Sequence, residues 1–263
     1  FSQLEKALTP NTKALFLESP SNPLLKVSDL PGLCAWAREK GLLTIVDNTF
    51  MTPYLQRPLE FWGAVGVDRG TKILGGASGV GGGLVGGKDK KVGADIQFIQ
   101  NSLGGILGPQ DSWLTLRGIK TLKVRMDASE KSARIIAQGL AASPYIKAVH
   151  YPGLASHPGH ALLKAQAAGF GAVLSFDLGT EKLAKAVMKG VKLPIVAVSL
   201  GAVESILSYP ATMSHSAIPA PVRHEMGIGD GLLRLSVGLE NAEDILQDIL
   251  SAVEKSAEEE KRR

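Results

Sequence analysis

The sequence predicts an α/β fold in which a mostly parallel sheet is flanked by helices. Two short apolar runs, residues 13–19 and 42–48, read as buried strands, and a helical pattern over residues 29–41 separates them. A weaker strand candidate at residues 64–68 follows a connecting segment. Strands that alternate with helix-length segments indicate right-handed crossovers and a parallel sheet.

The second half of the chain predicts a smaller C-terminal α/β domain. Pro109 suits the first turn of a long helix, which we expect to bridge the two parts over about residues 109–142, with or without a kink. We therefore divide the chain into a large-domain part, residues 1–122, and a small domain, residues 123–263. The small domain should contain strands at residues 147–151, 172–178, 195–201 and 232–238, and helices at residues 180–191 and from Asn241 onward.

Composition excludes several classes of protein. Of 263 residues, 44% are hydrophobic and 21% charged, which is typical of a globular chain, and the net charge of +4 is dispersed. The chain has no basic stripe interleaved with aromatic residues, so nucleic-acid binding is not predicted. No apolar run approaches the roughly 18 residues of a membrane span. The single cysteine, Cys34, is expected to be a buried thiol on an inward helix face, which fits a reducing compartment.

The strand ends direct attention to three segments. In open parallel sheets, ligands bind beyond the carboxyl ends of the strands, here residues 19–22, 47–49 and 68–72. Asp47 closes one strand and has four possible roles: metal ligand, base, helix cap or partner of a protonated ring nitrogen. Lys72 follows the next strand, and a lysine facing an aspartate is the layout of a pyridoxal-phosphate site. The alternative is a surface lysine before a glycine-rich turn.

Several long motifs resemble one enzyme family, in its order and spacing. The chain is similar to the Cys/Met-metabolism group of fold-type I pyridoxal-phosphate enzymes, which includes cystathionine lyases and synthases, methionine γ-lyases and homoserine sulfhydrylases. The resemblance spans nearly the whole chain and is strongest to bacterial cystathionine lyases. It rests on ESPSNP (18–23), VDNTFMTPYLQRPLE (46–60), TKILGG (71–76), IQNSLGGILGPQDSWLTLRGIKTLKVRM (99–126), YPGLASHPGH (151–160) and GDGLLRLSVGLE (229–240).

The resemblance implies a cofactor site for pyridoxal 5′-phosphate (PLP). Lys72 would bond to the cofactor aldehyde and then move protons, and Asp47 would pair with the pyridinium nitrogen. Asn22 would lie near the ring hydroxyl, and Thr71 would give its hydroxyl to the phosphate. Without the resemblance, Asn22 is equally explained as a turn residue.

The resemblance also implies a substrate site. Arg234 would bind the substrate α-carboxylate, for which a bidentate guanidinium is well suited. Ser199 would support that carboxylate and Lys72. Without the resemblance, Arg234 is a surface ion-pair partner and Ser199 a strand-end hydroxyl.

The implied activity is cleavage of cystathionine to homocysteine, pyruvate and ammonia by a carbon–sulfur lyase. The alternatives are a γ-replacement enzyme of the cystathionine γ-synthase or homoserine sulfhydrylase type, or an inactive truncated relative. The resemblance further implies a cytoplasmic homo-oligomer, dimer or tetramer, with no nucleic-acid or membrane partner. No metal site is expected, because His157 and His160 read as a loop at a helix start.

Two departures from the family pattern stand out. The family has a further N-terminal part before the position of Phe1, which carries other portions of the cofactor site. The segment 61–81 also diverges. There, Asp68 and Arg69 stand where the family has histidine and serine, and Ala77 and Gly79 replace a histidine and an aspartate.

Overall fold

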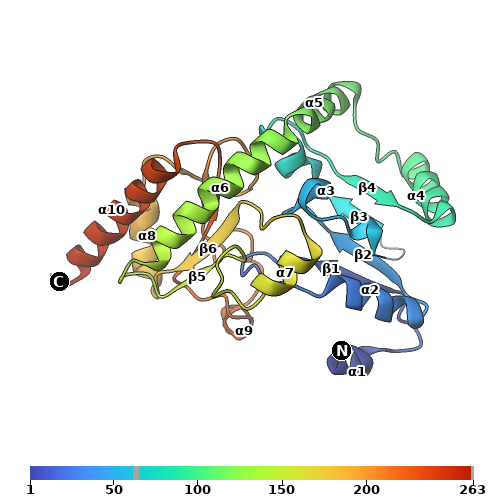
Figure 1. The fold of residues 1–263 in the computed structure, drawn as a ribbon, viewed down its shortest axis with the longest axis horizontal. Helices are drawn as coiled ribbons and strands as arrows, with labels where there is room; N and C mark the ends of the chain where they lie inside the picture. The colour runs from blue at the N-terminus through green and yellow to red at the C-terminus, as the bar shows by residue number, and fades with distance from the viewer. Residues whose placement is uncertain (62–64, 262–263) are drawn as a thin grey trace.

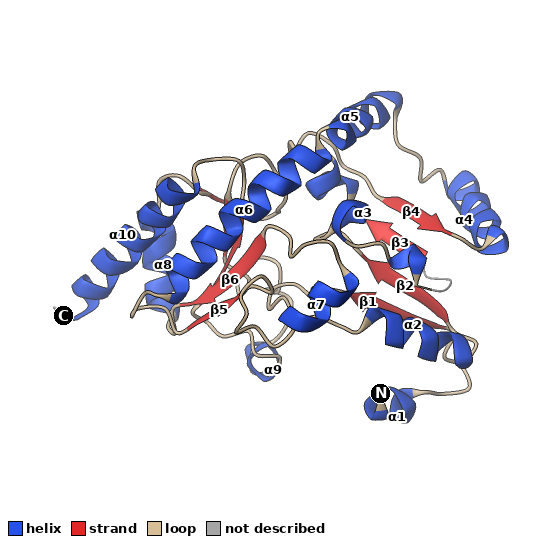
Figure 2. Cartoon of the chain, in the orientation of Figure 1, coloured by secondary structure: helices blue, strands red, loops and turns tan. Residues whose placement is uncertain are grey.

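A computed structural model describes residues 1–61 and 65–261 of the chain. Its helices and strands form two sheets joined by long helices (Figures 1 and 2). Within the described ranges, no helix is long and apolar enough to cross a bilayer. The largest cluster of buried apolar side chains among the described residues lies at the second sheet and the helices packed on it.

The first sheet has the order β1-β2-β3-β4. Its strands are β1 (Ala14–Glu18), β2 (Leu43–Asp47), β3 (Val65–Asp68) and β4 (Leu84–Gly87). The β1–β2 and β2–β3 pairs are parallel, as expected, and β4 runs antiparallel to β3. Because Glu18 pairs with Asp47 in register and Asp47 with Val67, the carboxyl ends of three strands meet at one edge.

One helix crosses between the first two strands. Helix α2 (Leu30–Glu39) begins where the side chain of Asp29 accepts a hydrogen bond from the amide of Gly32. Its inward face places Leu30 and Cys34 against Val46, so the predicted buried thiol is confirmed. The other helical segments of this half are α1 (Ser2–Ala7), α3 (Thr52–Leu55), η1 (Pro58–Glu60), η2 (Gly70–Leu74) and α4 (Lys90–Leu103).

The bridge between the two sheets consists of two helices. Helix α5 (Pro109–Lys120) is followed by the single residue Thr121, and α6 (Leu122–Ala141) begins directly after that residue. The buried guanidinium of Arg125 lies at this break and donates hydrogen bonds to the carbonyls of Ile73, Leu74 and Gly118. The predicted helix over 109–142 is therefore interrupted, and Arg125 ties the break to the turn that carries Lys72.

The second sheet has the order β5-β6-β9-β8-β7. Its strands are β5 (Ala148–His150), β6 (Val173–Asp177), β7 (Ile195–Val196), β8 (Ile206–Ser208) and β9 (Leu232–Ser236). Helices α6, α8 (Glu181–Gly190) and α10 (Ala242–Lys261) gather beside it and form the main core (Figure 1). Two shorter helices, α7 (His160–Gln166) and α9 (Ala220–Glu225), lie in its connections.

One strand prediction needs correction, one strand was missed, and one predicted strand is confirmed over its described residues. The strand expected over 195–201 stops at Val196, because Ser199 takes a positive φ of 102°, which no strand residue adopts. The short strand β8 was not predicted. For the strand expected at 64–68, the structure gives Val65–Asp68, and Ala64 lies outside the described residues.

Candidate active site

Lys72 lies in a turn between the two sheets. The turn η2 follows β3, and Lys72 is its one residue with non-helical dihedral angles. Its amine donates a hydrogen bond of 2.6 Å to the hydroxyl of Ser199. Burial, followed by the nearby charges of Arg234 and Arg69, lowers the pKa of Lys72 below its ordinary value. The amine is therefore easier to deprotonate than that of a surface lysine.

Asp47 ends the central strand β2 and is 6% exposed. Its Oδ1 accepts hydrogen bonds from the amide of Thr49 at 3.0 Å and from the Thr49 hydroxyl at 2.5 Å. Its Oδ2 lies 3.6 Å from Nε of Arg69. One carboxylate oxygen is thus fixed by the chain, and the other faces the largely exposed guanidinium of Arg69.

Arg234 is held inside the second sheet by three partners. Its guanidinium donates to Oδ1 of Asn22 at 2.9 Å, to the carbonyl of Ser199 at 2.7 Å and to the hydroxyl of Ser208 at 3.1 Å. Only 3% of Arg234 is exposed, and this burial lowers its pKa to about 10, which still leaves it charged at neutral pH. Its buried Nε has no hydrogen-bond partner among the described residues.

These side chains share one cavity of about 110 Å³. Of the predicted site residues, the structure brings Lys72, Asp47, Asn22, Ser199 and Arg234 to its wall. The complete lining is Glu18, Asn22, Asp47, Thr49, Phe50, Arg69, Lys72, Ser199, Leu200, Ser214 and Arg234. The cavity therefore combines three cations with two carboxylates in a partly buried space.

Thr71 is placed differently from the other predicted residues. It is not in the described cavity lining; its hydroxyl donates to the carbonyl of Gly82 at 3.2 Å and accepts from the Gly82 amide at 2.9 Å. This pair holds the turn against the segment that leads into β4. A role for Thr71 at the phosphate remains a prediction.

Two acidic groups at the same strand ends have pKa values raised above the ordinary range. Burial raises the pKa of Glu18, although its Oε2 accepts a hydrogen bond from the amide of Asn22. Burial and the nearby charge of Asp47 raise the pKa of Asp68 to about 6. Oδ1 of Asp68 is buried without a hydrogen-bond partner in the described part of the chain.

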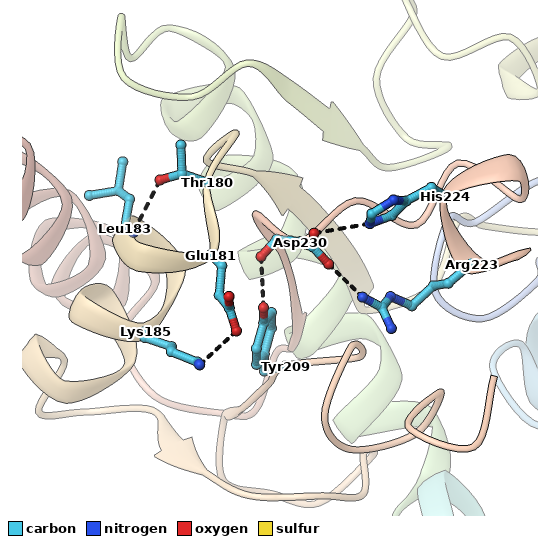
Figure 3. A network of polar contacts seen from close by, with 8 residues as sticks. All are labelled: Thr180, Glu181, Leu183, Lys185, Tyr209, Arg223, His224 and Asp230. Atoms are coloured by element: carbon cyan, nitrogen blue, oxygen red, sulfur yellow. Dashed lines mark hydrogen bonds and ion pairs between the residues drawn. The ribbon is translucent and has the colours of Figure 1, made fainter. Parts of the chain in front are cut away.

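A polar network holds the segment that brings Ser214 to the cavity (Figure 3). At the start of this segment, the hydroxyl of Tyr209 donates to the backbone carbonyl of Asp230 at 2.8 Å. At its end, Arg223 and His224 of α9 contact the two carboxylate oxygens of the same residue at 2.5 and 3.0 Å. Asp230 thus fixes both ends of the segment, just before the strand that carries Arg234.

Comparison with known proteins decides the family. Residues 1–254 match the family described as "Cys/Met metabolism PLP-dependent enzyme". The chain belongs to this family. A "Cystathionine gamma-lyase" of Bacillus subtilis (strain 168) is 52% identical over 252 residues, which cover 96% of this chain and 66% of that protein. A "Cystathionine beta-lyase MetC" of the same organism is 48% identical over 97% of this chain and 66% of its own length.

Solved structures of family members agree with the fold. A cystathionine γ-lyase from Lactobacillus plantarum, complexed with L-serine, superposes with a TM-score of 0.94 at 40% identity, over 97% of this chain and 67% of that one. A cystathionine γ-synthase from Xanthomonas oryzae pv. oryzae, in complex with cystathionine, superposes with a TM-score of 0.94 at 41% identity. This match covers 98% of this chain and 67% of that one. These matches confirm the predicted PLP-enzyme fold. The chain spans about 66% of the length of the curated relatives.

The residues present fit PLP, the cofactor of this family. Lys72 offers an amine of lowered pKa for the aldehyde. Oδ2 of Asp47, which Thr49 leaves open and Arg69 faces at 3.6 Å, is the oxygen that would meet a protonated ring nitrogen. These two residues would hold the cofactor from two neighbouring strand ends. The fit is less complete at the phosphate, because the hydroxyl of Thr71 already bonds Gly82.

Sequence reasoning missed some of the residues that build the site. Ser208 lies beside Arg234 because β8 and β9 pair in that register, and no motif indicates this. Ser214 belongs to a turn-rich segment without a recognisable pattern. Thr49, by contrast, lies within a predicted strand-end segment, and its position two residues after Asp47 was the available signal.

Proposed function

We propose that the protein containing this chain is a PLP-dependent carbon–sulfur lyase that uses water to cleave cystathionine to homocysteine, pyruvate and ammonia. One observation carries the proposal: the amine of Lys72 shares a cavity with the carboxylate of Asp47 and the guanidinium of Arg234. The cofactor aldehyde, the protonated ring nitrogen and the substrate α-carboxylate each have a complementary partner there, in the amine, the carboxylate and the guanidinium respectively. The curated relatives named above as lyases support the same reaction.

The proposed roles follow from the contacts. Arg234 binds the substrate α-carboxylate through guanidinium N–H groups that its protein partners leave free, while Asn22 and Ser208 keep the guanidinium plane in place. Ser199 holds the amine of Lys72 near the substrate Cα, where Lys72 acts as the base that removes the proton. PLP, when bound, supplies the electron sink for this step, and Asp47 maintains a proton on its ring nitrogen.

A second candidate is a γ-replacement enzyme that joins cysteine to an activated homoserine. The observation that favours it is the similarity to the Xanthomonas cystathionine γ-synthase. Cleavage on the γ side of cystathionine is a third possibility within the same chemistry, because the Bacillus relative at 52% identity is named a γ-lyase. All three reactions use the same base and the same carboxylate partner, so the products must separate them.

The test uses the full-length protein with bound PLP and identifies products by mass spectrometry. Homocysteine plus pyruvate from cystathionine supports the proposal. Cysteine plus 2-oxobutanoate indicates γ-elimination, and cystathionine made from acyl-homoserine and cysteine indicates the replacement reaction. The Lys72→Ala variant, checked for folding by circular dichroism, should lose every one of these products.

The protein's assembly and location are further proposals. We infer a homo-oligomer, a dimer or tetramer, in the cytoplasm. Support for assembly comes from large apolar side chains exposed on α4 and at the start of α6: Phe98 is 72% exposed, Leu103 81% and Val124 72%. We also propose the domain boundary at residues 122 and 123, beside the break between α5 and α6. Light scattering of the full-length protein tests the oligomer, and a stable monomer with bound cofactor would contradict it.

A further inference from the structure

The guanidinium of Arg69 faces the one carboxylate oxygen of Asp47 that Thr49 leaves open. Oδ1 of Asp47 accepts two hydrogen bonds from Thr49, and Oδ2 lies 3.6 Å from Nε of Arg69. This separation is longer than a hydrogen bond, so the two groups attract each other mainly by charge. Asp47 is buried, and Arg69 is its only cationic partner among the ion pairs of the described residues.

Arg69 differs from the other cations of the cavity in its freedom to move. The amine of Lys72 is bonded to Ser199, and Arg234 is held by three oxygens. Arg69, in contrast, has 63% of its side chain exposed, and its backbone amide donates to the hydroxyl of Thr49 at 3.0 Å. The main chain of Arg69 is thus fixed beside Asp47, while the guanidinium is able to swing into solvent.

A protonated ring nitrogen needs the same oxygen. A pyridinium N–H donates to one carboxylate oxygen, and Oδ1 is already saturated by an amide and a hydroxyl. Two cations that converge on one oxygen repel each other, so the ring can pair fully with Oδ2 only after the guanidinium has moved away.

We propose that Arg69 is a resident counter-ion of Asp47 that competes with the pyridinium nitrogen of PLP, so that this side chain lowers the cofactor affinity of the chain. The inference depends on the cofactor and not on which carbon–sulfur bond is cut. If the lyase reaction is not found, the competition between Arg69 and the ring nitrogen can still hold. If that competition is not found, the lyase reaction can still hold.

The test measures binding to the full-length apoprotein of pyridoxine 5′-phosphate and of pyridoxine, by equilibrium dialysis or calorimetry. Neither compound has an aldehyde, so the amine chemistry of Lys72 does not enter, and only pyridoxine lacks the phosphate. In the Arg69→Ser variant both compounds should bind about two- to fivefold tighter, the range of an exposed ion pair, and the gain should shrink at high salt. The Arg69→Lys variant keeps the positive charge, so its affinity for the two compounds should increase less.

A matched control is available in Arg57→Ser. Arg57 is 64% exposed and pairs with Glu60 at 3.4 Å, but it is not part of the cavity lining. This variant should bind both compounds as the parent protein does. Unchanged binding in Arg69→Ser would overturn the proposal. So would weaker binding of pyridoxine 5′-phosphate with pyridoxine unchanged, because Arg69 would then be a phosphate ligand.

Discussion

The amine of Lys72 lies 2.6 Å from the hydroxyl oxygen of Ser199, a residue 127 positions later in the chain that adopts a φ of 102°. This backbone conformation is unfavourable for any residue with a side chain other than hydrogen. Here it turns the chain so that the hydroxyl of Ser199 reaches Lys72 while its carbonyl accepts from Arg234. One strained residue therefore links the proposed base to the proposed carboxylate partner.

Replacing Ser199 by alanine should lower kcat about tenfold and leave covalent PLP attachment to Lys72 intact. The reason is loss of the hydrogen bond that orients the amine, since a bond to a charged group contributes roughly 1.5 kcal/mol. Steady-state kinetics and mass analysis of borohydride-reduced protein measure the two effects. The control is Ser216→Ala, which removes an exposed hydroxyl that donates to the carbonyl of Met213. An unchanged kcat would exclude this orienting role.

The Arg234→Lys variant should raise KM for cystathionine about a hundredfold and change kcat less. A lysine keeps the charge but loses the fork that meets Asn22, the Ser199 carbonyl and a planar carboxylate together. The comparison substrate is the corresponding amine without the α-carboxylate, whose KM should hardly respond. If KM for both compounds rises equally, the carboxylate is bound elsewhere.

Asp68 should make the fold less stable as the pH rises. Its pKa is about 6 in the folded chain, against 3.8 for the ordinary side chain, so the folded state holds the proton more tightly. The stabilisation is complete below about pH 4 and is lost as the pH rises through about 6. Asp68→Asn should therefore raise the free energy of unfolding at pH 8 by up to about 3 kcal/mol and by little at pH 4. Urea titrations at both pH values measure this, and an equal effect at both would contradict it.

Loss of the Asp230 carboxylate should loosen the segment that carries Ser214. In Asp230→Asn, the contacts to Arg223 and His224 weaken, while the bond from Tyr209 to the backbone carbonyl remains (Figure 3). We expect faster proteolysis within residues 210–219 and a rise in KM of about two- to fivefold, the scale of partly exposed ion pairs, with PLP binding unchanged.

The matched control for this variant is Asp127→Asn. Asp127 also accepts from two partners, Lys123 and the hydroxyl of Tyr54, but it lies outside the cavity. Its substitution should alter neither the cleavage rate of residues 210–219 nor KM. If both variants behave alike, the effect is general destabilisation and Asp230 does not position the segment.

The positions of the proposed cofactor residues followed from elementary rules, whereas their roles came from the family resemblance. Apolar strands in alternation with helices predicted that Asp47 and Lys72 end neighbouring strands at one edge, and the structure places both in one cavity. The strand-end rule also covered Asn22 and Thr49. Local sequence suffices here, because a parallel sheet brings these positions together whatever the rest of the chain does.

The substrate half did not follow from local sequence. Arg234 and Ser199 came only from family resemblance, because the second sheet brings them to the cavity through antiparallel pairing that periodicity does not encode. The strand expected over 195–201 was too long for a related reason, since β7 covers only Ile195–Val196. Its apolar β-branched residues predict a strand, but the contacts of Ser199 with Lys72 and Arg234 require a left-handed backbone. Tertiary contacts overrode the local preference.

Helix α4 buries little of its surface against the rest of the described chain. Its ends are well defined, since Asp89 accepts from the amides of Lys91 and Val92, yet all fourteen residues are at least partly exposed. Figure 1 shows it standing off beside β4. A helix of this length is marginal in water, so its order must come from whatever covers its apolar side chains. In the homo-oligomer that we propose, formation of α4 and association of subunits are one coupled equilibrium, and amide exchange in this helix should slow as protein concentration increases.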